Sequence, residues 1–354
     1  MKRTNIFCLL LLVNCSLIIA NCTAQVSEEK HLKNIRQLTF GGNNAEAYFS
    51  RDSKYVSFQS DNPAWGLSCD QIFYMDVEKG LKDPKTRPSF ISTSFGRTTC
   101  SFFMPNGKQI LYGSTHEGSG HACPPVPETG KKYLWAIYDS FDIYVADLKG
   151  KIRKQLTNSP GYDAEATVSP DGKKIVFTST RNGDLDLYTM DIDGKNVKQI
   201  TNELGYDGGA FFSPDSKKLV FRASRFASED ERTEYKENLK KNLVAPTNME
   251  IFTCNADGSD LKQITKLGKA NWAPYFNHTG NKIIFASNHH STRGYDFQLY
   301  MINIDGTNLE KITTESNFNA FPMFSYDGKK VIFSSNRNNG GTRDTNLFIA
   351  DWVE

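Results

Sequence analysis

The sequence predicts an all-β fold: a six-bladed β-propeller of four-stranded antiparallel blades, with the ring closed by the N-terminal strand joining the last blade. Three observations support this prediction. One phrase of strands and turns occurs six times, its segments have the length of strands, and the chain begins and ends part-way through a copy. Recurrence at intervals of roughly 44 to 64 residues indicates a repeat architecture.

The clearest copy shows the elements of one blade. It has a Q-L-T strand end at 155–157, a Pro-Asp-Gly-Lys turn at 170–173, an aromatic strand at 186–190 and an Asp-Gly turn at 193–194. The strand that follows the first turn is expected at 55–58, 110–112, 175–177, 219–221, 283–285 and 331–333. The next strand is expected at 71–74, 142–145, 186–188, 250–252, 298–300 and 346–349.

The phase of the repeat predicts how the ring closes. The first strand, at 35–39, precedes any complete copy, and the last copy ends on its third strand at 348–351. Pairing these two strands removes two exposed sheet edges. The alternative is an open array of β-sandwiches, which leaves both edges unpaired.

Composition narrows the classes of partner. The 354 residues carry a formal charge of +2, and no run of Lys and Arg is interleaved with aromatic residues. We therefore expect no nucleic-acid partner, and a monomer with a single propeller domain at 34–354.

The N-terminus reads as a targeting segment. Lys2 and Arg3 precede an apolar stretch, so residues 1–22 are expected to be a signal peptide and 23–33 a short tether. Residues 19–22 resemble a lipobox with Cys22 as the lipidated residue, whereas cleavage after Ala24 would give a soluble protein. Either route predicts export, to the periplasm or as an outer-membrane lipoprotein, with membrane contact only through the lipid anchor.

Cysteine usage agrees with an oxidising compartment. Cys69, Cys100 and Cys123 fall near one face of the predicted propeller, and we expect a disulfide among them. The sequence leaves the pairing open. Cys254 is expected to be a small buried residue.

Loop lengths distinguish the two faces. The first-to-second and third-to-fourth connections are expected to be tight turns throughout, so the long insertions gather on the other face. One insertion follows Ser114 and is rich in proline. The other, 226–247, starts with a capping box at Ser228 and Glu231 and predicts a helix to about Lys241. These insertions are expected to form either a lid or docking element, or a decoration over an apolar patch.

The channel mouth on the long-loop face is the expected binding site. Carboxylates, arginines, histidines and a tryptophan there suit a sugar or peptide ligand, and the alternative is a solvated rim. The candidate residues are Glu46, His116, Asp163, Glu165, Arg181, Asp207, Arg225, Trp272, His289 and Arg337.

Motifs for catalysis are scarce. The sequence contains no G-x-S-x-G, H-E-x-x-H or C-x-x-C pattern, and no His and Cys spacing matches a standard metal site. We therefore expect no catalytic residues, no metal and no cofactor.

The repeat motifs at 169–173, 190–194 and 324–329 resemble the WD-like propeller repeats of the TolB family. Residues 96–100, 114–116 with 123–125, and 348–352 resemble a subgroup of exported TolB-like proteins. The resemblance implies a non-enzymatic propeller that binds a protein or a peptidoglycan-associated partner in the bacterial cell envelope. The alternative is a carbohydrate-active enzyme, either a polysaccharide lyase or a glycosidase, built on a bare propeller. A third reading is a propeller that stabilises a multi-protein complex.

Overall fold

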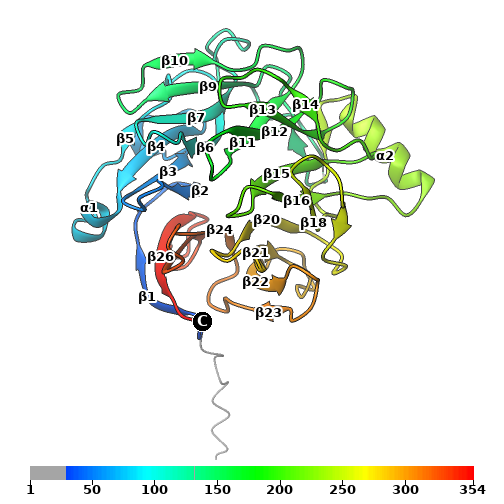
Figure 1. Cartoon of the computed structure of the whole chain (residues 1–354). Coiled ribbons are helices and arrows are strands. Elements are labelled where there is room, and N and C mark those ends of the chain that lie inside the picture. The colour runs from blue at the N-terminus through cyan, green and yellow to red at the C-terminus, as the bar shows by residue number, and fades with distance from the viewer. Residues whose placement is uncertain (1–28, 131) are drawn as a thin grey trace, which may run out of the picture.

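Six four-stranded antiparallel sheets surround a central axis in the computed structural model, which describes residues 29–130 and 132–354 (Figure 1). The predicted six-bladed β-propeller is confirmed. The signal peptide, Cys22 and most of the tether lie outside the described residues. Among the described helices, none is long and apolar enough to cross a membrane.

Each blade takes its four strands in chain order, except the sixth, which combines the first strand of the chain with the last three. The first blade contains β2 (Asn44–Phe49), β3 (Tyr55–Ser60), β4 (Gln71–Asp76) and β5 (Ser89–Phe90). The second contains β6 (Thr98–Phe103), β7 (Gln109–Ser114), β9 (Asp142–Asp147) and β10 (Ile152–Gln155). The third contains β11 (Asp163–Val168), β12 (Lys174–Ser179), β13 (Asp186–Asp191) and β14 (Lys198–Gln199). The fourth contains β15 (Asp207–Phe212), β16 (Lys218–Ala223), β18 (Glu250–Asn255) and β19 (Lys262–Gln263). The fifth contains β20 (Asn271–Phe276), β21 (Lys282–Ser287), β22 (Gln298–Asn303) and β23 (Glu310–Lys311). The sixth contains β24 (Asn319–Phe324), β25 (Lys330–Ser335), β26 (Asn346–Trp352) and β1 (Leu32–Gln37).

The sixth blade closes the ring as predicted. Strand β1 pairs antiparallel with β26, with Leu32 opposite Trp352 and Gln37 opposite Phe348. Figure 1 shows the two ends of the described chain side by side in this blade. Because β1 begins at Leu32, part of the predicted tether belongs to the sheet.

An aromatic pair recurs in the core of every blade. The fourth residue of each second strand lies directly opposite an aromatic residue of the third strand, with ring centroids 5.9–6.4 Å apart. Such pairs add to the hydrophobic burial that holds a blade together. The six pairs are Phe58–Phe73, Tyr112–Tyr144, Phe177–Tyr188, Phe221–Phe252, Phe285–Tyr300 and Phe333–Phe348.

A bulge that was not predicted from the sequence recurs in every first strand. The pairing with the second strand shifts by a residue at the same place in each blade. One residue at each bulge has a left-handed backbone, which is unusual for residues other than glycine. The six residues are Glu46, Cys100, Glu165, Gly209, Ala273 and Phe321.

The two faces differ in loop length, with one correction to the prediction. In the first blade, the third-to-fourth connection contains helix α1 (Val77–Lys82) and not a tight turn. The side chain of Asp76 accepts a hydrogen bond from the backbone N–H of Lys79 and so caps this helix. The opposite face carries the short 3-10 helix Pro63–Trp65 and the two long insertions.

Candidate functional site

The insertions of blades two and four join above the channel on the long-loop face. Strand β8 (Trp135–Ala136) of the first insertion pairs with β17 (Leu243–Val244) of the second. We call this two-stranded element, with the loops that carry it, the cap. The Lys132 ammonium and the Glu234 carboxylate form an ion pair 2.6 Å long between the two insertions.

Helix α2 (Glu229–Leu239) supports the cap. The capping box predicted at Ser228 and Glu231 is present, and the helix ends at Leu239 and so is slightly shorter than expected. Tyr235 is buried against Phe226, and its hydroxyl donates to the carboxylate of Asp184 in blade three. The insertion of blade four is therefore also fastened to blade three.

A disulfide holds the first insertion. Cys69, between the second and third strands of blade one, is bonded to Cys123 in the insertion of blade two. Cys100 remains a free thiol in the channel, and Cys254 is free and buried. The disulfide expected among Cys69, Cys100 and Cys123 is therefore present, and it joins Cys69 to Cys123.

A cavity of about 190 Å³ lies beneath the cap. Four of its lining residues, Glu46, Glu165, Ala273 and Phe321, are bulge residues of the first strands. The cap contributes Trp135 to the wall. The bulges therefore direct these four side chains into the channel, which a regular strand would not do.

Glu165 is the centre of a buried hydrogen-bond network. The Arg222 guanidinium forms an ion pair with it, the Tyr206 hydroxyl donates at 2.7 Å, and the Thr178 hydroxyl donates at 2.8 Å. The backbone N–H of Gly209 donates at 2.9 Å. Burial alone would raise the pKa of Glu165, but Arg222 and these donors hold the pKa below its usual value.

Arg222 also supports the cap from below. Its guanidinium carbon lies 5.3 Å from the ring centroid of Trp135 and 5.0 Å from that of Tyr206. These cation–π contacts place Trp135 over the network.

Glu46 is the second channel carboxylate, and its environment differs. The Cys100 thiol donates to it at 2.8 Å, and no cation forms an ion pair with it among the described residues. Burial raises the pKa of Glu46 to about 7. Burial, with the nearby carboxylates of Glu46 and Glu165, also raises the pKa of the Cys100 thiol, so Cys100 is a poor nucleophile.

A pH-dependent stability follows from the raised pKa of Glu46. In the unfolded chain the carboxyl titrates near 4.3, so between about pH 4.3 and 7 the folded protein binds an extra proton. Stability should therefore fall as pH rises through this window, by about 3–4 kcal/mol in total. We expect Glu46→Gln to remove this part of the slope in urea unfolding from pH 5 to 8. Glu78→Gln, which changes an exposed carboxylate, should keep the wild-type slope; equal slopes in all three proteins would contradict the assignment.

A second ion pair lies at the edge of the cavity. The Arg97 guanidinium donates to the carboxylate of Asp70 at 2.5 Å and lies 5.7 Å from the ring of Tyr138. Burial raises the pKa of Asp70, although Arg97 opposes the shift. The cavity therefore presents carboxylates and guanidinium groups against an aromatic wall, which suits a polar ligand of small size.

The sequence-predicted residues do not form a single site. Glu46, Glu165 and Trp272 line the channel cavity, as expected for the mouth. The other seven do not line it. They are His116, Asp163, Arg181, Asp207, Arg225, His289 and Arg337.

Five of these seven occupy one position of the repeat, and each covers the aromatic pair of its own blade. The arginine carbons lie 4.9–5.1 Å from a ring centroid of the pair, and the two histidine rings lie 4.4 and 4.6 Å from a tyrosine of the pair. Asp163 and Asp207 are buried and neutralise Arg181 and Arg225 within their blades. These contacts show that the seven residues stabilise their own blades. The expectation that all ten candidate residues form one site at the channel mouth is therefore corrected.

Arg222 was not predicted as a site residue, although the sequence contains a signal for it. When the six second strands are aligned, Arg222 occupies a buried position where the other blades have small or neutral residues. The equivalents are Gln59, Gly113, Thr178, Ala286 and Ser334. A lone charge at such a position indicates a partner carboxylate.

An apolar groove of about 510 Å³ opens beside the channel. Trp272 lines both hollows and stacks on Phe297 with ring centroids 4.3 Å apart. Two further aromatic side chains at the groove are unusually accessible: Tyr295 is 80% exposed and Tyr133 is 59% exposed. We call this feature the aromatic groove. Its charged lining residues in the described chain are Lys269 and Arg293.

The described residues contain no group of three or more His, Cys, Asp or Glu side chains that could hold a metal ion. His116 donates to or accepts from the Ser114 hydroxyl at 2.9 Å and is buried, and burial lowers its pKa. His116 therefore stabilises blade two through these contacts.

This chain is similar to several known propellers. The TolB beta-propeller domain family matches residues 126–231. A protein assigned as TolB from Agrobacterium tumefaciens aligns with 88% of this chain and 91% of its own, with a TM-score of 0.57 and 21% identity. TolB from Acinetobacter baumannii aligns with 88% of this chain and 64% of its own, with a TM-score of 0.53 and 20% identity. An oligogalacturonate lyase from Vibrio parahaemolyticus aligns with 90% of this chain and 80% of its own, with a TM-score of 0.54 and 13% identity.

The resemblance of this chain to TolB-like propellers is confirmed by these similarities. At these levels of identity the solved structures establish the shared fold.

Proposed function

We propose that this chain is an exported, non-enzymatic TolB-like propeller that binds a protein partner of the bacterial cell envelope on its long-loop face. The observation that carries the proposal is the aromatic groove, where exposed Tyr133 and Tyr295 flank an apolar hollow. Exposed aromatic patches of this kind mark interaction sites, because leaving them in water is unfavourable.

The chemistry of the groove indicates what the partner presents. Arg293 is exposed, no acidic side chain of the described chain lines the hollow, and the floor consists of Trp272, Phe297 and Phe318. A segment with an apolar side chain next to a carboxylate would complement both the floor and the cation. The cap beside the groove is held by the Cys69–Cys123 disulfide and by the pairing of β8 with β17, and these contacts would limit the ordering cost of binding.

The proposal includes export, with the periplasm or the outer membrane as the destination and Cys22 as the lipidated residue. The N-terminal segment has the composition of a signal peptide, and the Cys69–Cys123 disulfide is typical of an oxidising compartment. A globomycin-sensitive shift in the mobility of the wild-type chain, absent in Cys22→Ser, would support lipidation.

The partner site can be tested by crosslinking in the native cells. We expect the wild-type chain to capture an envelope protein and a Tyr295→Ala/Arg293→Ala variant to lose it by tenfold or more, since loss of an anchor residue costs about 2 kcal/mol. Val197→Ala, which shortens an exposed apolar residue on the opposite face, is the matched control. Equal capture by all three proteins would place the partner elsewhere.

A second candidate function is a carbohydrate-active enzyme, and one observation favours it. Glu46 and Glu165 line one cavity, and their pKa values are shifted in opposite directions by burial and by the ion pair with Arg222. Opposed shifts of this kind are found in acid and base pairs. The similarity to an oligogalacturonate lyase suggests oligogalacturonate as the first substrate to test. Cleavage of pectic fragments or other glycans by the wild-type chain but not by Glu46→Gln would favour this function over the binding proposal.

A further inference from the structure

The arginines at the blade rims are neutralised differently in blade six. In blades three and four, the residue that begins the first strand is an aspartate, which pairs with the arginine of its own blade. In blade six the corresponding residue is Asn319, which accepts one hydrogen bond from Arg337 at 3.0 Å and brings no charge. Because Arg337 is only 7% exposed, its charge needs another partner.

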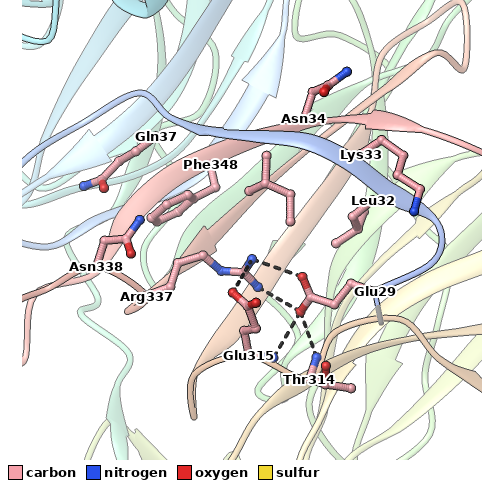
Figure 2. Close-up of a pocket in the computed structure, with 11 residues that line it drawn as sticks. Glu29, Leu32, Lys33, Asn34, Gln37, Thr314, Glu315, Arg337, Asn338 and Phe348 are labelled. Atoms are coloured by element: carbon pink, nitrogen blue, oxygen red, sulfur yellow. Dashed lines mark hydrogen bonds and ion pairs between the residues drawn. The ribbon is translucent and has the colours of Figure 1, made fainter. Parts of the chain in front are cut away.

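Glu29, before the first strand, supplies the missing carboxylate. Arg337 donates to both Glu29 oxygens at 3.1 Å, and the backbone N–H groups of Thr314 and Glu315 donate to Oε1 at 2.8 and 3.1 Å (Figure 2). Glu29 is itself 9% exposed. The Glu315 carboxylate also lies 3.8 Å from Arg337, but this side chain is 63% exposed and its contribution is screened.

The neighbours of Glu29 fix the same segment between blades five and six. Lys30 pairs with Glu310 at 2.6 Å, and the ring of His31 stacks on that of Trp352 at 4.9 Å. The backbone N–H of Leu32 donates to the carbonyl of Glu29 at 2.9 Å, which turns the chain into the closing strand. Residues 29–32 therefore bridge the seam at which the ring closes.

We propose that blade six contains a carboxylate-binding socket, formed by Arg337, Asn319 and the two backbone N–H groups, and that Glu29 is its resident ligand. The side chain fastens the N-terminal segment over the ring seam and acts as a latch. When Glu29 is absent, the socket takes a free carboxylate. A hollow of about 550 Å³, partly lined by Lys33 and Gln37, borders the socket, so a small anion can reach it (Figure 2).

The first test is chemical rescue of Glu29→Ala by formate. The variant should melt roughly 3–6 °C below the wild type, because a buried arginine loses its counter-charge. Sodium formate should restore part of this loss, whereas the same concentration of sodium chloride should not. The wild type, whose socket is filled, should not respond specifically to formate. Formate stabilising both proteins equally, or an unchanged melting temperature in the variant, would overturn the proposal.

A second variant separates the latch from overall stability. In Glu29→Ala/Asn319→Asp, the new carboxylate copies the arrangement of blades three and four, so the melting temperature should recover without formate. The N-terminal segment should remain released, and trypsin should cleave after Lys30 faster than in the wild type by tenfold or more. If the double variant protected Lys30 as well as the wild type does, Glu29 would not be the latch. Glu315→Ala, which removes the exposed neighbour, should leave both readouts near the wild type.

Discussion

Replacing Glu165 with leucine is expected to lower the free energy of unfolding by about 3–5 kcal/mol, which is large against the total stability of most domains. Arg222 is 7% exposed and would keep its charge without a counter-charge inside the ring. The hydroxyl of Thr178 and the backbone N–H of Gly209 would also lose their acceptor. Guanidinium unfolding of the purified propeller measures the change.

Two comparisons make the Glu165 prediction specific. The double variant Glu165→Leu/Arg222→Leu removes both charges together and should recover most of the lost stability. Asp147→Asn, which breaks an ion pair with the half-exposed Arg153 on the opposite face, should leave stability close to that of the wild type. A Glu165→Leu protein within 1 kcal/mol of the wild type would show that the network does not hold the ring together.

Loss of the Cys69–Cys123 disulfide is expected to cost about 4 kcal/mol. The bond closes a loop with a sequence separation of 54 residues, so its removal returns substantial entropy to the unfolded chain. The native state would also lose the bond between the cap insertion and blade one. The measurement is unfolding of a Cys69→Ala/Cys123→Ala variant beside the wild type.

Reductant supplies the control for the disulfide prediction. It should lower the stability of the wild type towards that of the double variant and leave the variant unchanged, although Cys100 and Cys254 are still present as thiols. If reductant changed neither protein and the two were equally stable, the cross-link would have no part in stability.

The blades can be predicted from the amino-acid sequence alone. Strand length, turn chemistry and the alternation of apolar residues are short-range properties that can be read from the sequence. Because they recur six times in one order, they predict both the number of blades and the strand that pairs with β26. The capping box at Ser228 likewise depends on residues three apart in the chain, and the structure contains it. Helix α1 was missed because the expectation of a tight turn was extended from five blades to the first.

The site could not be predicted in this way, because it depends on contacts between distant segments. The union of β8 with β17, the pairing of Cys69 with Cys123 and the network of Glu165 with Arg222 join segments that lie far apart in the sequence. No local pattern encodes such contacts, because they depend on how the blades pack around the axis. Glu29 is the clearest case, since its partner Arg337 lies 308 residues away at the other end of the chain. The repeats place an arginine at the same position after the second strand in three blades. Only the folded ring shows that Arg181 and Arg225 pair within their own blades, whereas Arg337 pairs with Glu29.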